Sequence, residues 1–417
     1  MSNERMITLL LCLISVFSGV VASNNRTATA DPLLVVVIMV KNEEPVIVES
    51  LEGYVKGGVD AFLVYDTGST DRTIERITDY FNKIGITRFV IEQEPFVDFA
   101  SSRNRGIALA EHHFPNAGFF IMPDAEWYIH GVEELLQFCR QALMNEHYNL
   151  FSITTYYKDD SSHYGVPRLF RTNAYIRFKY RVHEIPISDR PTFKVPESVW
   201  IDHNPSAYGD EKTHRRIARD IEWLFLEHKE DPADTRPLYY LGQEYTVLGE
   251  YHKAIKYLKM RNQLADQVGE KLPEEHFVAL LRMGQMYEQL FFKGEASWQD
   301  AEDMLIRAAL YRPSRLEPLI HLASHYMYCN DLVRAYVYLI QACNAPYPNN
   351  DVLSINKELY DFDRWNILAG VAAQLGKLSE AYDAACIALN VHPDAPIARA
   401  VSAHCRQEFE KQQQYMS

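Results

Sequence analysis

The sequence predicts an α/β domain with a mainly parallel sheet, followed by an all-helical solenoid. Two observations predict the first part: buried apolar runs alternate with amphipathic stretches, and polar residues follow the runs. A third predicts the second part, because the strand pattern stops near residue 210 and one helical pattern then recurs. A chain of 417 residues is long enough for two domains, or three.

The α/β domain is read from four apolar runs, at residues 33–40, 61–65, 88–92 and 119–122. The first, "LLVVVIMV", is continuous and β-branched, which is typical of a strand buried on both faces. Helical patterns follow the first three runs; one of them, "RTIERITDYFNKIG", is amphipathic and closes at Gly85. This alternation favours a parallel sheet, in which ligands bind beyond the carboxyl ends of the strands.

The helical part repeats with a period typical of tetratricopeptide units. Ala301 and Ala335 are 34 residues apart, which is the tetratricopeptide period. Four passes keep the same order of small and apolar residues, beginning at Leu238, Gly284, Leu319 and Trp365. One match would mean little because Ala and Leu at helical spacing usually form core, but four in register indicate a solenoid.

We therefore divide the chain into five segments by residue number. These are a leader (1–23), the α/β domain (24–209), a linking helix (210–235), the repeats (236–396) and a tail (397–417). The leader has an apolar core from Ile7 to Val21, which favours a cleaved signal peptide. An uncleaved anchor is the second interpretation and a cytoplasmic protein the third, so we expect a secretory or membrane-associated protein, with a cytoplasmic one as the alternative.

Charge and cysteine content exclude some classes of function. A formal net charge of −14 argues against a nucleic-acid surface, because phosphate backbones need a basic face. It leaves room for a small anion that arrives with a divalent metal. Outside the leader the five cysteines show neither CxxC pairing nor metal-ligand spacing, so we expect buried thiols and no disulfide framework.

Asp124 and Glu126, in "FFIMPDAEWYI", are the sharpest chemical signal. Side chains two apart at a strand end point the same way. Two carboxylates facing one site suit Mg²⁺ or Mn²⁺, which take oxygen ligands and share them with substrate phosphates. The alternative is a surface loop with two unrelated acids, because the DxE spacing alone is weak.

Other polar residues follow the remaining strands. Asp66 ends the second run ahead of the helix-capping residues of "DTGSTD", so capping does not explain it, and it could accept a hydrogen bond from a ligand. "KNEE" alone reads as a solvated helix start. Arg103 could hold a phosphate, although an exposed Arg is more often merely solvated. Further candidates lie in a basic stretch and just beyond it: Arg168, Arg171, Arg181, His183, Glu184 and His203.

Taken together, "VVVIMVKNEE", "LVYDTGSTDRT", "DFASSRNRGIAL", "MPDAEW" and "RLFR…RVHE" resemble family 2 inverting glycosyltransferases of the GT-A fold. With the trailing repeats, the chain is most similar to the subgroup that carries C-terminal tetratricopeptide repeats. The resemblance implies a metal-dependent (Mn²⁺ or Mg²⁺) enzyme that moves a sugar from a nucleotide-diphosphate donor, by expectation a UDP-sugar. The acceptor would be a hydroxyl of a glycan, lipid or protein, and the repeats could bind a protein partner.

The resemblance also implies roles for individual residues. Glu184 would be the general base, and Asp124, Glu126 and His183 would hold the metal. The nucleotide-sugar would contact a wider set, made up of Lys41, Asn42, Glu43, Asp66, Arg103, Asn104 and Asp124. Glu126 and Trp127 depart from the family pattern, which usually has Asp and then a further acid at these positions. The alternative function is a degenerate transferase domain whose repeats act as a protein-binding scaffold.

Overall fold

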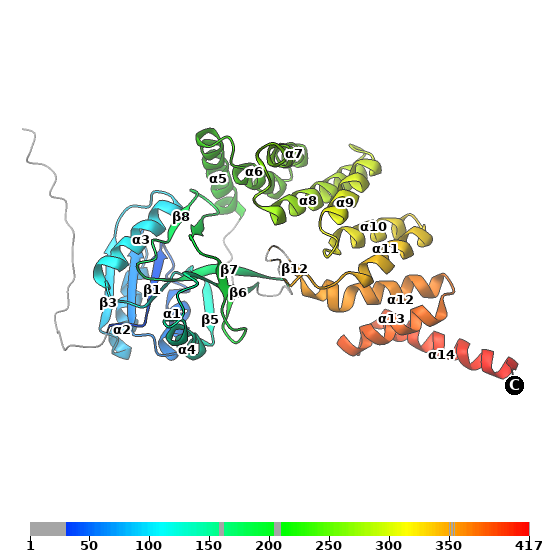
Figure 1. Ribbon diagram of the computed structural model, residues 1–417, viewed down its shortest axis with the longest axis horizontal. Helices are drawn as coiled ribbons and strands as arrows, with labels where there is room; N and C mark the ends of the chain where they lie inside the picture. The colour runs from blue at the N-terminus through cyan, green and yellow to red at the C-terminus, as the bar shows by residue number, and fades with distance from the viewer. Residues whose placement is uncertain are drawn as a thin grey trace, which may run out of the picture.

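The computed structural model describes residues 31–416 except 158–161, 204–209, 350, 352 and 354. The predicted leader therefore lies outside the described residues. Figure 1 shows a sheet domain from which an arc of paired helices extends, with the junction at α5 (Asp210–Glu230) and α6 (Arg236–Val247). In the part of the chain that is described, no helix combines the length and apolar character needed to cross a membrane.

The sheet domain is built on a mostly parallel mixed sheet, which confirms the predicted fold class. Its strands follow the order β3-β2-β1-β4-β7-β6-β11-β5, and β3, β2, β1 and β4 run parallel. β10 pairs with β6, and β12, from the helical part, pairs with β7. The strands of this domain are β1 (Leu34–Val40), β2 (Ala61–Asp66), β3 (Arg88–Gln93), β4 (Phe119–Ile121), β5 (Trp127–His130), β6 (Leu150–Tyr157), β7 (Ser162–Arg171), β8 (Arg177–Lys179), β9 (Ile185–Ile187), β10 (Thr192–Lys194) and β11 (Trp200–His203).

Alternate residues of the central strands pack on opposite faces of the sheet. Val36 and Ile38 join the core that contains α1, α2 and α4, while Val35 and Val37 join the core that contains α3. All four valine and isoleucine side chains are fully buried, as expected for strands covered on both faces. The helices are α1 (Ile47–Lys56), α2 (Thr73–Ile84), α3 (Phe99–His113) and α4 (Val132–Ala142).

The helical part forms the predicted tetratricopeptide-like solenoid of antiparallel helix pairs. Small residues allow close approach within pairs: a Cβ on Gly242 would lie 2.4 Å from the Leu258 side chain, and one on Gly284 would lie 2.7 Å from Leu305. The pairs are α6 with α7 (Tyr251–Val268), α8 (Pro273–Phe292) with α9 (Trp298–Tyr311), α10 (Glu317–Tyr328) with α11 (Leu332–Asn344), and α12 (Arg364–Gln374) with α13 (Leu378–Val391); α14 (Pro396–Met416) follows.

The solenoid touches the sheet domain again beyond the first repeat. β12 (Ile355–Asn356) pairs antiparallel with β7, and Figure 1 shows it beside the β6–β7 hairpin. The chain leading to β12 is held on the solenoid, because the Leu353 N–H donates to Glu274 at 2.8 Å and its carbonyl accepts from Arg315 at 3.1 Å. The two parts are thus connected at two separate places.

We expect Gly131→Ala to destabilise the sheet domain by about 2–4 kcal/mol. Gly131 has φ +73°, and a Cβ there would lie 2.0 Å from the carbonyl oxygen of Ser198, which cannot move without shifting the chain. Denaturant unfolding followed by tryptophan fluorescence measures the loss. The control is Gly249→Ala, with φ +71° but open space, which should cost only about 1 kcal/mol. Equal losses would contradict the role of close packing.

Candidate functional site

Parallel pairing brings the predicted residues to one edge of the sheet. Val40 lies opposite Asp66 in the β1–β2 register, so the chain segments that follow both strands leave the sheet side by side. β4 runs parallel on the other side of β1 and leads through Met122 to Asp124. Segments 41–44, 66–73 and 122–126 therefore share this edge, which is the place where ligands bind in such sheets.

The loops after β1 and β2 are joined by hydrogen bonds. Asn42, which has φ +59°, donates its N–H to Ser69 at 3.0 Å and accepts the Thr70 N–H at 2.7 Å. The Glu43 N–H donates to the Thr73 hydroxyl at 2.8 Å. Lys41 is exposed at the same loop. These contacts fix the shape of the edge before any ligand binds.

Asp66 is buried, and each of its carboxylate oxygens accepts one hydrogen bond from a protein donor. One carboxylate oxygen accepts the Ser69 N–H at 2.9 Å and the other accepts the Gln93 side-chain amide at 2.8 Å. Gln93 ends β3 directly opposite Asp66 in the parallel register. Asp66 thus lies at the predicted place, with its orientation set by Ser69 and Gln93.

Arg103 pairs with Asp124 and Glu184, two acids that lie far apart in the sequence. Its guanidinium forms a short ion pair with Asp124 and a hydrogen bond of 2.5 Å with Glu184, and the arginine side chain is only 4% exposed. Arg168 lies 3.0 Å from Glu184 and 4.0 Å from Asp124. Two guanidiniums and two carboxylates thus form a buried neutral network, which we call the arginine–carboxylate network.

An aromatic surface supports this network. The Arg103 and Arg168 guanidiniums lie 5.6 and 5.2 Å from the ring centroid of Phe178, and Arg168 lies 5.5 Å from Trp127. Rings at this distance attract cations through their quadrupole. One nitrogen of each guanidinium, Nη1, has no hydrogen-bond partner among the described residues, so each retains a donor.

The network keeps both carboxylates ionised. Burial alone would raise the pKa of Asp124, but Arg103 and Arg168 lower it below its usual range. The same opposition lowers the pKa of Glu184, which lies within 3.0 Å of both guanidiniums. A carboxylate held in this way accepts a proton poorly, so these contacts argue against the predicted general-base role of Glu184 and favour a role as counter-ion.

Asn104 has a structural role in this arrangement. Its side-chain amide donates to the Phe178 carbonyl at 2.9 Å and accepts the Phe178 N–H at 2.7 Å. This reciprocal pair attaches α3 to β8. Its predicted contact with the nucleotide stays a prediction, since the amide is already used by the backbone of Phe178.

The predicted metal set of Asp124, Glu126 and His183 is not brought together. His183 has φ +53° and points to α6, where its ring stacks on Tyr240 and Nε2 lies 2.9 Å from Glu244. The described residues contain no group of three His, Cys, Asp or Glu side chains arranged to hold a metal ion.

His203 takes the place next to the predicted acids instead. Its Nε2 lies 3.8 Å from Glu126, while Nδ1 forms a 3.1 Å hydrogen bond with the Tyr164 hydroxyl. A second contact of this kind typically orients a metal-binding histidine. Glu126 and His203 are of residue types that ligate divalent ions, and Mg²⁺ or Mn²⁺ can take further ligands from substrate phosphates and water.

Sequence reasoning treated Arg168 and His203 only as general candidates and did not single out Gln93 or Phe178. The register of the parallel strands sets Gln93 beside Asp66 and could have indicated the role of Gln93. Nothing in the local sequence signals that Phe178 would lie against two arginines.

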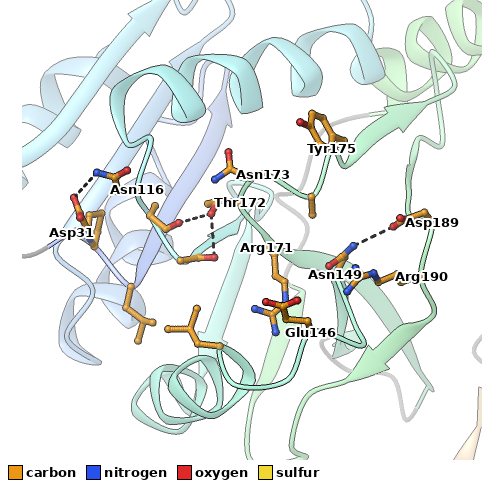
Figure 2. Close-up of a pocket in the computed structure, with 16 residues that line it drawn as sticks. Asp31, Asn116, Glu146, Asn149, Arg171, Thr172, Asn173, Tyr175, Asp189 and Arg190 are labelled. Carbon is orange, nitrogen blue, oxygen red and sulfur yellow. Dashed lines mark hydrogen bonds between the residues drawn. The ribbon is translucent and has the colours of Figure 1, made fainter.

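A hollow of about 720 Å³ lies at the opposite edge of the sheet, where β1 and β4 begin. Figure 2 shows that Asp31, Glu146, Arg171 and Asp189 line it. The Arg171 guanidinium donates to the Tyr148 carbonyl at 2.8 Å and to the carbonyls of Ala142 and Asn145 at the end of α4. Arg171 therefore stabilises a helix end, as cations near a C-terminus do, and is separate from the carboxyl edge.

Comparison with known proteins gives a family match for the sheet domain. Residues 35–191 match the model of "Glycosyl transferase family 2". Over this range, which is less than half of the chain, the protein is similar to family 2 glycosyltransferases. Its strands β1 to β4 and the arginine–carboxylate network all lie within the matched range.

Two curated relatives are also glycosyltransferases. They are glycosyltransferase SunS of Bacillus phage SPbeta and the SPbeta prophage-derived glycosyltransferase SunS of Bacillus subtilis (strain 168), each 27% identical over 237 residues. The match covers 55% of this chain and 53% of theirs, so the chain spans about half the length of these relatives.

Two solved structures each match less than half of this chain. The C-terminal part of a TPR repeat-containing protein from Cytophaga hutchinsonii is 14% identical, with a TM-score of 0.34, over 46% of this chain and 66% of that one. A double mutant of MamA RS-1 is 15% identical, with a TM-score of 0.32, over 45% of this chain and 92% of that one.

We expect Glu184→Leu to lower the free energy of unfolding by about 3–5 kcal/mol, because two buried guanidiniums would lose their counter-ion. Glu184→Gln, which keeps an acceptor oxygen, should lose less. The wild-type pKa is lowered, so the advantage over Glu184→Gln should be complete above the ordinary carboxyl pKa of 4.5 and shrink as the pH falls through the folded value. Denaturant unfolding between pH 3 and 8 measures the stability of wild type and Glu184→Gln. A stability difference that did not change with pH would contradict the pairing of Glu184 with the guanidiniums.

Proposed function

We propose that this protein is a metal-dependent inverting glycosyltransferase that uses a UDP-sugar donor. The observation that carries the proposal is the convergence of Asp66, Asp124, Glu126 and two buried arginines at the carboxyl edge of a family 2 domain. The SunS relatives support glycosyl transfer in general. UDP, the metal and the inverting course are inferred from the family resemblance.

The nucleoside would lie against the joined loops after β1 and β2. Asp66, oriented by Ser69 and Gln93, offers carboxylate oxygens at the end of β2 to an N–H of the base. Lys41 lies exposed beside it and can meet the negative charge of the nucleotide. Asp124, with its side chain 34% exposed, would face the ribose.

The diphosphate would lie over the network. Glu126 and His203 would help to hold the divalent ion, which when bound would neutralise charge that develops on the leaving diphosphate. Arg168, whose side chain is 12% exposed, would lie beside the diphosphate. Because Asp124 and Glu184 balance the charges of Arg103 and Arg168, the divalent ion would supply the net positive charge in this region.

The acceptor would approach from the face opposite the diphosphate, as a single displacement with inversion requires. It would be a hydroxyl of a glycan, lipid or protein. The solenoid could also bind a protein partner, since helical repeats of this kind often present extended binding surfaces. A secretory or membrane-associated location remains part of the proposal, with a cytoplasmic one as the alternative.

We expect UDP to bind the purified protein, and Mn²⁺ to tighten binding by about tenfold, which corresponds to about 1.4 kcal/mol. Glu126→Gln should abolish the gain from Mn²⁺ and keep the metal-free binding. The matched control is Glu134→Gln, an exposed acid on α4, which should behave like wild type. Titration calorimetry measures all three proteins.

Absence of UDP binding by the folded wild type, with and without Mn²⁺, would contradict the enzyme. It would favour the alternative function, in which the sheet domain supports repeats that bind a protein partner. An equal gain from Mn²⁺ in Glu126→Gln would remove only the assigned metal site.

A further inference from the structure

The hairpin β8–β9 connects the arginine–carboxylate network to the first repeat. On the transferase side it supplies Phe178, which lies against both guanidiniums, and Glu184, which pairs with both of them. Asn104 holds the backbone of Phe178 through two hydrogen bonds. The Arg181 carbonyl accepts the Phe99 N–H at 3.0 Å. The hairpin is thus part of the candidate site.

The other side of the hairpin is bound by α5, α6 and the turn between them. Lys179 and the Tyr180 hydroxyl both donate to Asp234, at 2.9 and 2.8 Å. The Arg181 guanidinium makes two hydrogen bonds of 2.7 Å with Glu230. Each of three successive hairpin residues therefore has a side-chain partner on the helical part.

His183 makes the most enclosed of these contacts. It pairs with Glu244, whose side chain is 9% exposed, and its ring stacks on Tyr240 at a centroid distance of 3.9 Å. Its carbonyl accepts a hydrogen bond of 3.1 Å from Arg236, which is itself paired with buried Glu275. The residue next to Glu184 is therefore held on α6 through side chain and backbone.

The backbone of this segment depends on those contacts. Tyr180 and His183 have φ of +79° and +53°, in the left-handed region that non-glycine residues rarely adopt. Such conformations persist where the surroundings impose them. Here the imposing groups are Asp234 and Glu244 of the helical part, together with Asn104 of the sheet domain.

We propose that the turn between α5 and α6, together with the first repeat, is a functional part of the donor site. Asp234 and Glu244 are positioning residues: they hold the β8–β9 hairpin so that Glu184 and Phe178 keep Arg103 and Arg168 next to Asp124. The inference rests on the proposed function, since it concerns the same donor site. By thermodynamic linkage, a molecule that binds the first repeat and alters it changes the affinity of the site for the donor. The donor then changes the affinity of the first repeat for that molecule by the same factor.

The test measures UDP affinity in Glu244→Leu and Glu244→Gln, by titration calorimetry of the full chain with Mn²⁺. Glu244→Leu should weaken UDP binding about tenfold, because the hairpin loses its closest contact with α6. Glu244→Gln keeps an oxygen that accepts the His183 N–H and should stay within about twofold of wild type. The control is Glu250→Gln, an exposed acid at the start of α7 that pairs with Lys253.

A merely structural role predicts a different result. Glu244→Leu would then unfold at a lower temperature while the folded protein, well below that temperature, bound UDP as wild type does; this outcome overturns the proposal. If Glu244→Leu does not fold, a double variant of the exposed partners, Lys179→Met with Arg181→Met, tests the same clamp and should also weaken UDP binding. Unchanged affinity there overturns the proposal as well.

The proposed function and the positioning role can fail independently of each other. If wild type does not bind UDP, the proposed function fails. If wild type binds UDP and the variants bind it equally well, the donor site stands and only the positioning role of the first repeat fails.

Discussion

The pairing of Arg103 with both Asp124 and Glu184 is the interaction on which the rest of the site depends. One guanidinium, almost wholly buried, joins a helix, a strand end and a hairpin that lie 81 residues apart at the extremes. Removing any member would leave an unpaired charge in a region with little access to water. The network therefore restrains the carboxyl edge of the sheet.

This constraint extends to the organisation of the whole chain. Glu184 reaches Arg103 only because its hairpin is held between α3 and the first repeat. The pairing of β12 with β7 adds a second connection between sheet and solenoid. The repeats are thus joined to the candidate site more closely than a domain on a flexible linker would be, so their removal should affect the sheet domain as well.

The sequence was sufficient for the fold class and for the edge of the sheet, for physical reasons. Buried β-branched runs identify strands, and Asp66 and Asp124 follow strand ends directly, so parallel pairing alone brings them together. The positions of His183 beside Glu244 and of His203 beside Glu126 could not be predicted from strand ends. The left-handed backbone at His183 turns it towards Glu244, and antiparallel pairing of β11 with β5 sets His203 beside Glu126. Both depend on residues distant in sequence.

Hydrogen–deuterium exchange of the full chain, with and without UDP and Mn²⁺, tests the central claim most directly. The account predicts slower exchange on ligand binding in residues 41–44, 66–73, 122–127 and 177–187, because donor and network lie together at that edge. Residues 143–149, beside the hollow at the opposite edge, should not change. Slower exchange at the opposite edge, with unchanged exchange at the carboxyl edge and in the hairpin, would contradict a donor site at the carboxyl edge.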